Sequence, residues 1–201
     1  MLKEPDAFYT ESPTYMGVDY GPINSKNSYT VVTIVTRLDD GRFKLIYAKK
    51  YVGSEANYSF VHDDIPRLFT KWNCRLIGAD HGFGEASNAA IRKNLKAFNK
   101  VIAYQHVPTQ KERMQYNAKL PAYTLSRTTI MTDFFTKIKR KQVIFPKWDD
   151  FEPFGKDILN IYTEYNEERG SMRYVNSGAD DFFHSWLFAM VTGESHLNAT
   201  T

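Results

Sequence analysis

The chain has 201 residues, of which 42% are hydrophobic and 24% charged, and this balance is typical of a globular protein with a substantial core. Its formal net charge of +3 is too small to indicate a nucleic-acid partner by itself. The single cysteine, Cys74, excludes a disulfide framework within the chain, and no apolar run approaches the roughly 18 residues of a membrane span. We expect one domain over residues 1–201, with flexible ends at 1–13 and 196–201.

The first half of the sequence has the patterns of strands joined by short connections. Residues 15–21 alternate in character, residues 28–38 are rich in β-branched side chains, and residues 42–52 follow the hairpin signal Asp39-Asp-Gly41. This series predicts an antiparallel meander. Four further elements are expected after it: a helix at 54–73, a short strand at 75–80, a helix at about 85–98 and a strand at 100–107.

The second half is expected to contain mostly helices. The elements are a polar loop at 108–123, a helix at 124–140, a short strand at 143–145, a helix within 151–169 that ends at Gly170, and a buried helix over 177–191. The whole order predicts an α/β fold flanked by helices. Its mixed sheet would have an antiparallel meander, strands one to three, followed by parallel strands four and five.

Two acidic residues occupy equivalent places in predicted strands. Gly17 and Asp19 share one face of the first strand, and glycine neighbours would leave open space beside this carboxylate. Gly78 and Asp80 repeat the pattern in the fourth strand. If these strands pair, the two carboxylates lie side by side. The alternatives are that Asp19 forms an ion pair with a lysine, because strand interiors disfavour aspartate, and that Asp80 caps the following helix.

A second pair of acids stands at the start of the last predicted helix. Asp180 and Asp181 follow a candidate N-cap at Asn176 or Ser177, and His184 is four and three residues further on. The acids can be explained as complements of the helix dipole, and the histidine as an ordinary core residue. His106 is interpreted as an ordinary polar residue.

Convergence of these carboxylates would imply a metal site. Three or four carboxylates cannot all stay ionised in one place without a cation. Oxygen ligands favour Mg²⁺ or Mn²⁺, and two such ions can clamp a phosphodiester during hydrolysis. The expected ligands are Asp19, Asp80, Asp180 and Asp181.

Basic residues gather in one third of the chain. They are Lys111, Arg113, Lys119, Arg127, Lys137, Lys139 and Arg140. A solvated helix face is one explanation, and a track for the DNA backbone is the other. Residues 111–123, which also carry aromatic side chains, are the best candidate for a segment that touches DNA.

Three phrases in this order resemble the RNase H-like nuclease superfamily: Met16-Gly-Val-Asp-Tyr-Gly21, Ile77-Gly-Ala-Asp-His-Gly-Phe-Gly84 and Gly178-Ala-Asp-Asp-Phe-Phe-His184. The branch that they resemble most is the C-terminal nuclease domain of the large terminase subunit of tailed bacteriophages, over most of the chain. The resemblance implies a metal-dependent endonuclease that cuts concatemeric double-stranded viral DNA with little sequence preference. It also implies that Asp19, Asp80 and one or both of the later acids bind metal, with His184 as a ligand or proton carrier.

The same resemblance implies partners that this sequence does not contain. They are a terminase ATPase domain, a small terminase subunit and the portal, acting with DNA in the host cytoplasm. The chain lacks a Gly-x-x-x-x-Gly-Lys-Ser/Thr loop, so we expect the nuclease portion alone and no ATP hydrolysis. A RuvC-type junction resolvase, a ribonuclease H and an inactive DNA- or partner-binding module stay open as alternatives.

Overall fold

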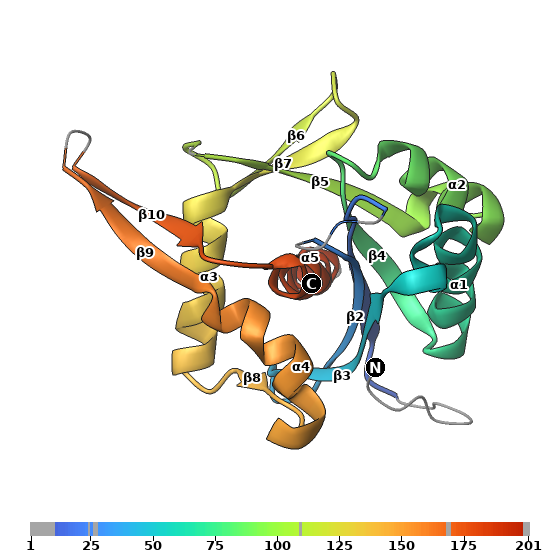
Figure 1. Ribbon diagram of the computed structural model, residues 1–201, viewed down its shortest axis with the longest axis horizontal. Coiled ribbons are helices and arrows are strands. Elements are labelled where there is room, and N and C mark those ends of the chain that lie inside the picture. Colours follow the sequence, from blue (N-terminus) through green and yellow to red (C-terminus); the bar gives the residue numbers. More distant parts are fainter. Residues whose placement is uncertain (1–10, 24, 26–27, 109, 168–169, 199–201) are drawn as a thin grey trace.

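An eight-stranded mixed sheet lies at the centre of the computed structural model, which describes residues 11–23, 25, 28–108, 110–167 and 170–198. Its strands are β1 (Thr14–Asp19), β2 (Thr30–Arg37), β3 (Phe43–Tyr51), β4 (Cys74–Asp80), β5 (Val101–Val107), β6 (Met114–Asn117), β7 (Ala122–Ser126) and β8 (Val143–Ile144). The strand order is β6-β7-β5-β4-β1-β2-β3-β8. A separate hairpin consists of β9 (Ile161–Asn166) and β10 (Ser171–Asn176), and it extends away from the sheet (Figure 1).

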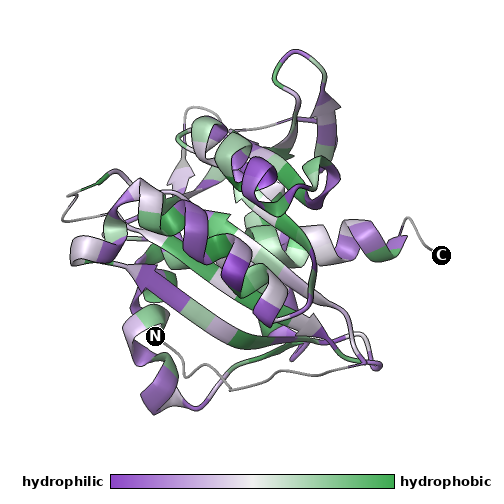
Figure 2. Cartoon of the chain, turned by 90° about the vertical axis from the view of Figure 1, so that its right-hand side faces the viewer, coloured by the Kyte–Doolittle hydropathy of each residue, from purple (hydrophilic) through white to green (hydrophobic). Residues whose placement is uncertain are grey.

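Helices cover both faces of this sheet. They are α1 (Tyr58–Lys71), α2 (Glu85–Leu95), α3 (Arg127–Lys139), α4 (Trp148–Leu159) and α5 (Asp181–Asn198), with short 3₁₀ turns at Gly53–Ala56 and Phe98–Lys100. Figure 1 shows α5 on one face of the sheet, between it and α3 and α4, and shows α1 and α2 on the opposite face. Figure 2 shows hydrophobic strands beneath α1 and α2, whose surfaces carry hydrophilic residues. Because α5 lies between two layers, all its residues from Asp181 to Gly193 are buried.

The predicted fold class is confirmed. β1, β2 and β3 form an antiparallel meander, β4 pairs in parallel with β1, and β5 pairs in parallel with β4. The short connections and alternating side chains of the first half were sufficient to predict this part of the sheet.

Several predictions in the second half were wrong. Residues 124–126, expected to begin a helix, belong to β7, and α3 begins only at Arg127. Residues 108–123 contain a strand, β6, which pairs with β7 and extends the sheet at its edge. The helix expected within 151–169 ends at Leu159, and the residues after it form β9 and β10. Ile161–Asn166 carries β-branched and aromatic residues that favour a strand. Gly170, expected to end a helix, has a φ of +56° and belongs to the hairpin connection.

The glycines two residues before the strand acids allow close helix packing, whereas we expected them to leave open space beside the carboxylates. Gly17 of β1 and Gly78 of β4 are direct neighbours in the sheet. A Cβ at Gly17 would overlap the Ser185 carbonyl oxygen, and a Cβ at Gly78 would lie 2.6 Å from the Phe188 carbonyl oxygen. The space that we expected to be open beside the carboxylate is therefore filled by the backbone of α5, which lies directly on the two strands.

The ends of the chain are described only in part. α5 continues to Asn198, and the Tyr15 hydroxyl lies 2.9 Å from Nδ1 of His196. Residues 1–10 and 199–201 of the expected flexible ends lie outside the described residues. Among the helices that the structure describes, none is long and apolar enough to cross a membrane.

Candidate functional site

The two strand acids lie side by side, as predicted. Asp19 and Asp80 are the last residues of β1 and β4, and they directly follow the parallel pair Val18–Ala79. No described lysine forms an ion pair with Asp19. Asp80 accepts a hydrogen bond from the Phe83 amide at 3.1 Å and so holds the turn before α2, whose own N-cap is Gly84. Both carboxylates are thus at the same edge of the sheet.

The start of α5 brings the second pair of acids to this edge. The helix begins at Asp181. The carbonyl oxygen of Asp180 accepts a backbone hydrogen bond from the His184 amide at 3.1 Å. Asp180 is therefore the N-cap, and the predicted cap at Asn176 or Ser177 was wrong, because the chain from β10 reaches the helix only after Ala179.

The acids of this pair have different partners. The carboxylate of Asp181 accepts hydrogen bonds from the Ser28 hydroxyl at 2.7 Å and the Tyr29 amide at 3.1 Å. The carboxylate of Asp180 lies 3.1 Å from Nε2 of His184 and 3.7 Å from Nη2 of Arg127. Asp181 therefore has neutral partners in the residues just before β2. Asp180 has basic partners, one on α5 and one on α3.

Folding shifts the pKa of all four carboxyls, because they are buried and are influenced by nearby charges. Burial raises the pKa of Asp19 well above its usual value, and the charges of Asp80, Asp181 and Asp180 raise it further. Burial also raises the pKa of Asp80 and that of Asp181, although hydrogen bonds oppose both shifts. Burial acts in the same direction on Asp180, but His184 and Arg127 outweigh it and lower the pKa of this carboxyl.

The donor set has the chemistry of a site for a hard divalent cation. Among the described ion pairs, Asp180 lies beside the guanidinium of Arg127 and the imidazole of His184, while Asp19, Asp80 and Asp181 have no basic partner. Three uncompensated carboxylates would be stabilised by Mg²⁺ or Mn²⁺. As they stand, no three His, Cys, Asp or Glu side chains of the described chain are arranged to hold a metal ion.

Sequence reasoning missed Asp157 of α4. Its carboxylate is buried, with only 3% of the residue exposed, and accepts hydrogen bonds from Lys50 Nζ at 2.8 Å and the Phe182 amide at 3.1 Å. It thereby fixes the first turn of α5 from another helix. The available signal was an aspartate three residues after Phe154 on the apolar side of the predicted helix.

His106 was also missed, since it was interpreted as an ordinary polar residue. It lies on β5, and its ring meets the ring of His184 edge to face, with the centroids 4.8 Å apart. In the pairing of β5 with β4, Tyr104 lies opposite Asp80, and His106 is two residues after Tyr104 along β5. No local pattern in the sequence indicates this position.

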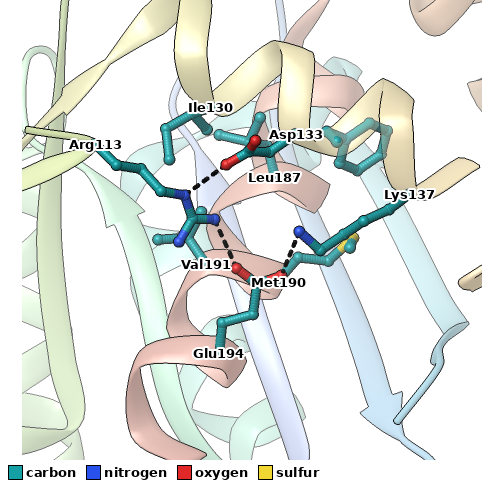
Figure 3. A pocket seen from close by; sticks show the side chains of 9 residues that line it. Arg113, Ile130, Asp133, Lys137, Leu187, Met190, Val191 and Glu194 are labelled. Atoms are coloured by element: carbon teal, nitrogen blue, oxygen red, sulfur yellow. Dashed lines mark hydrogen bonds and ion pairs between the residues drawn. The ribbon is translucent and has the colours of Figure 1, made fainter. Parts of the chain in front are cut away.

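Part of the predicted DNA track is used inside the fold. Arg113 bonds to Asp133 at 2.8 Å and to Glu194 at 2.6 Å, and Lys137 bonds to Glu194 at 3.1 Å (Figure 3). Arg127 lies beside Asp180, as described above. Four of the predicted residues are exposed: Lys111, Lys119, Lys139 and Arg140.

Comparisons with known proteins agree with this architecture. No protein-family profile matches the chain, and no curated protein matches its sequence. The crystal structure of the large terminase nuclease from thermophilic phage G20c aligns with a TM-score of 0.60 and 16% identity, over 92% of this chain and 84% of that one. The HK97 bacteriophage large terminase aligns with a TM-score of 0.61 and 11% identity, over 94% of this chain and 41% of that one.

These matches show that the chain has an RNase H-like fold. The fold is the one found in large terminase nucleases, and the match extends over most of the chain, as the sequence phrases predicted. The chain spans less than half of the HK97 large terminase. A third structure, the yeast mitochondrial Holliday junction resolvase Ydc2, aligns with a TM-score of only 0.39.

Proposed function

We propose that this chain is a divalent-metal-dependent endonuclease of the terminase type, which hydrolyses phosphodiester bonds in double-stranded DNA with little sequence preference. The observation that carries the proposal is the group of acids Asp19, Asp80 and Asp181, which share one edge of the sheet and lack cationic partners among the described residues. Keeping such acids together is unfavourable unless a cation neutralises them.

The same reasoning assigns different roles to the last two acids. Asp19, Asp80 and Asp181 would hold two Mg²⁺ or Mn²⁺ ions, and these ions, when bound, supply positive charge that offsets the charge developing on the phosphate. Asp180 is already paired with His184 and Arg127, so we propose that it completes the set as a weaker ligand.

Basic side chains would bind and orient the DNA. Arg127 retains 37% exposure beside the acids, which suits contact with a phosphate next to the cut bond. The exposed Lys111, Lys119, Lys139 and Arg140 would contact the backbone further away. Arg113 and Lys137 were predicted to contact DNA as well, and we propose that their first role is to attach the segment before β6 to α3 and α5.

The biological setting follows from likeness to terminase structures and is part of the proposal. The chain corresponds to a minor part of the HK97 large terminase, so we propose that it works with an ATPase domain. A small terminase subunit and a portal would complete the packaging machine that delivers concatemeric DNA in the host cytoplasm.

The test is cleavage of supercoiled plasmid in Mg²⁺ or Mn²⁺, with EDTA as the metal-free arm. Changing a residue that supports a metal ligand typically lowers activity 10- to 100-fold, so loss of a ligand should lower the rate by at least about 100-fold. We expect this for Asp19→Asn, Asp80→Asn and Asp181→Asn, and a smaller loss for Asp180→Asn. Asp40→Asn is the matched control, because Asp40 is exposed and pairs only with Arg42 among the described residues.

The same assay separates the alternatives. A four-way junction and an RNA–DNA hybrid are assayed in parallel with the plasmid. Preferred cleavage of the junction would indicate a resolvase, and preferred cleavage of the hybrid would indicate a ribonuclease H. Binding without cleavage of any substrate would indicate an inactive module. Unchanged rates in Asp19→Asn or Asp80→Asn would refute the metal site.

A further inference from the structure

His106 lies against the proposed active site and has no role in the function proposed above. Its ring stacks on Phe188 at a centroid distance of 5.3 Å, and meets the ring of His184 at 4.8 Å. His184 in turn lies 3.1 Å from the Asp180 carboxylate through Nε2. The order of contacts is therefore Asp180, then His184, then His106.

Four nitrogen atoms of the described side chains in this group are buried without hydrogen bonds, although Nε2 of His184 contacts the Asp180 carboxylate. In the described part of the chain, Nδ1 and Nε2 of His106, Nδ1 of His184 and Nε of Arg127 have no partner. Leaving a buried donor or acceptor unpaired is unfavourable, and native proteins rarely do so without a reason. A phenylalanine would fill the position of His106 without this cost.

The unpaired atoms are chemically complementary. Burial holds the pKa of His106 well below its usual value, and the charge of Arg127 acts in the same direction, so its ring is neutral, with one N–H donor and one acceptor. A neutral His184 that donates from Nε2 to the Asp180 carboxylate has an acceptor at Nδ1. The N–H of one ring and the acceptor of the other therefore match, and the two rings are already in edge-to-face contact with their centroids 4.8 Å apart. The terminal torsion of a histidine is broad, so the His106 ring can turn an N–H toward His184.

We propose that His106 is a positioning residue for His184. This inference rests on the proposed function: in the site loaded with DNA, a ring N–H of His106 donates to Nδ1 of His184 and completes the chain Asp180–His184–His106. The bond fixes the tautomer and orientation of His184, as partners behind an active-site histidine generally do. Catalytic hydrogen bonds are often loose in the free enzyme and tighten when substrate binds, which accounts for the unpaired nitrogens of the free chain.

The decisive variant is His106→Phe, which keeps a ring against Phe188 and His184 and removes both nitrogens. We expect a melting temperature equal to or above that of the wild type, because a buried unpaired polar group has been removed. We also expect plasmid nicking to fall about 10-fold in kcat with little change in KM, the lower end of the effect of losing such a partner. His106→Asn or His106→Gln restores a donor, and one of the two should recover part of the rate.

A control variant and a spectroscopic measurement distinguish a positioning role of His106 from a general effect of the substitution. His62→Phe makes the same change at a distant histidine bonded to Ser87, and should leave the rate unchanged. In ¹⁵N spectra of histidine-labelled protein, addition of a short DNA duplex without metal should shift the Nδ1 signal of His184 in the wild type but not in His106→Phe. Wild-type cleavage rates in His106→Phe, or the same DNA-induced shift in both proteins, would overturn the inference.

Failure of the proposed function gives a different pattern. If the wild type neither cuts plasmid in Mn²⁺ nor changes its His184 signal with DNA, the nuclease proposal fails and the positioning role fails with it. If the wild type cuts and His106→Phe cuts equally well, only the role of His106 is refuted.

Discussion

Replacing Gly17 by alanine tests whether the fold depends on direct contact between α5 and the sheet. The new Cβ would overlap the Ser185 carbonyl oxygen and lie 2.7 Å from the Ala189 amide nitrogen. Both obstacles are backbone atoms of a helix whose residues are buried from Asp181 to Gly193, so neither can turn aside. The whole helix must move outward.

The size of the effect follows from the distances. Ordinary Cβ contacts lie at 3.4–4 Å, so α5 has to move by about an ångström or more. Overpacking of a core typically costs about 1–3 kcal/mol, and we expect the upper end, about 3 kcal/mol, because backbone atoms are involved. In a domain of this size each kcal/mol lowers the melting temperature by about 2–4 °C, so the expected fall is about 6–12 °C.

Thermal unfolding followed by circular dichroism measures this fall. Gly78→Ala should behave similarly, since its Cβ would lie 2.6 Å from the Phe188 carbonyl oxygen. Gly53→Ala is the control, because nothing lies within 4 Å of its Cβ, and only the positive φ of 59° opposes alanine, at about 1 kcal/mol. If Gly17→Ala lowers the melting temperature no more than Gly53→Ala does, close packing of α5 on the strands is not what stabilises the fold.

Three further predictions concern charges around the site. Asp157→Ala should lower the free energy of unfolding by about 3 kcal/mol in urea titrations, because it leaves Lys50 Nζ, whose side chain is only 20% exposed, without its carboxylate. Asp19→Asn should raise the melting temperature at pH 7 without metal and leave it unchanged below about pH 3.8. The pKa of Asp19 is raised on folding, so its stabilising contribution is complete below the unfolded value of 3.8 and is lost as the pH rises through the folded value; a destabilised variant at pH 7 would contradict this. Lys119→Ala should reduce the slope of DNA affinity against salt by about 0.9 without a change in melting temperature. Arg113→Ala should lower the melting temperature, because it removes the ion pair of Asp133 and leaves Glu194 with Lys137 alone among the described ion pairs.

Much of the fold and part of the site could be predicted from local sequence. The meander β1–β2–β3 follows from alternation and short turns, and both depend on residues close together in the chain. The same patterns put Asp19 and Asp80 in two predicted strands, and the structure shows that these strands are neighbours. Prediction failed at β6, β9 and β10, because short strands at an edge or in a separate hairpin lack the apolar alternation of a core strand. It also failed at β7, a five-residue strand that continues directly into α3.

The sequence by its own patterns predicted that Asp19 and Asp80 end two strands and that Asp180 and Asp181 begin a helix, because alternation and helix starts depend on neighbouring residues. The pairing of β1 with β4, and the partners of each acid, came from the folded chain. Ser28 and Asp181 are 153 positions apart in the chain, and Arg127 reaches Asp180 from the start of α3. The same long-range packing brings His106 to His184 and fills the space beside Gly17 with α5. Carboxylate partners and helix contacts are properties of surfaces that meet only in the folded chain, and no spacing along the sequence encodes them.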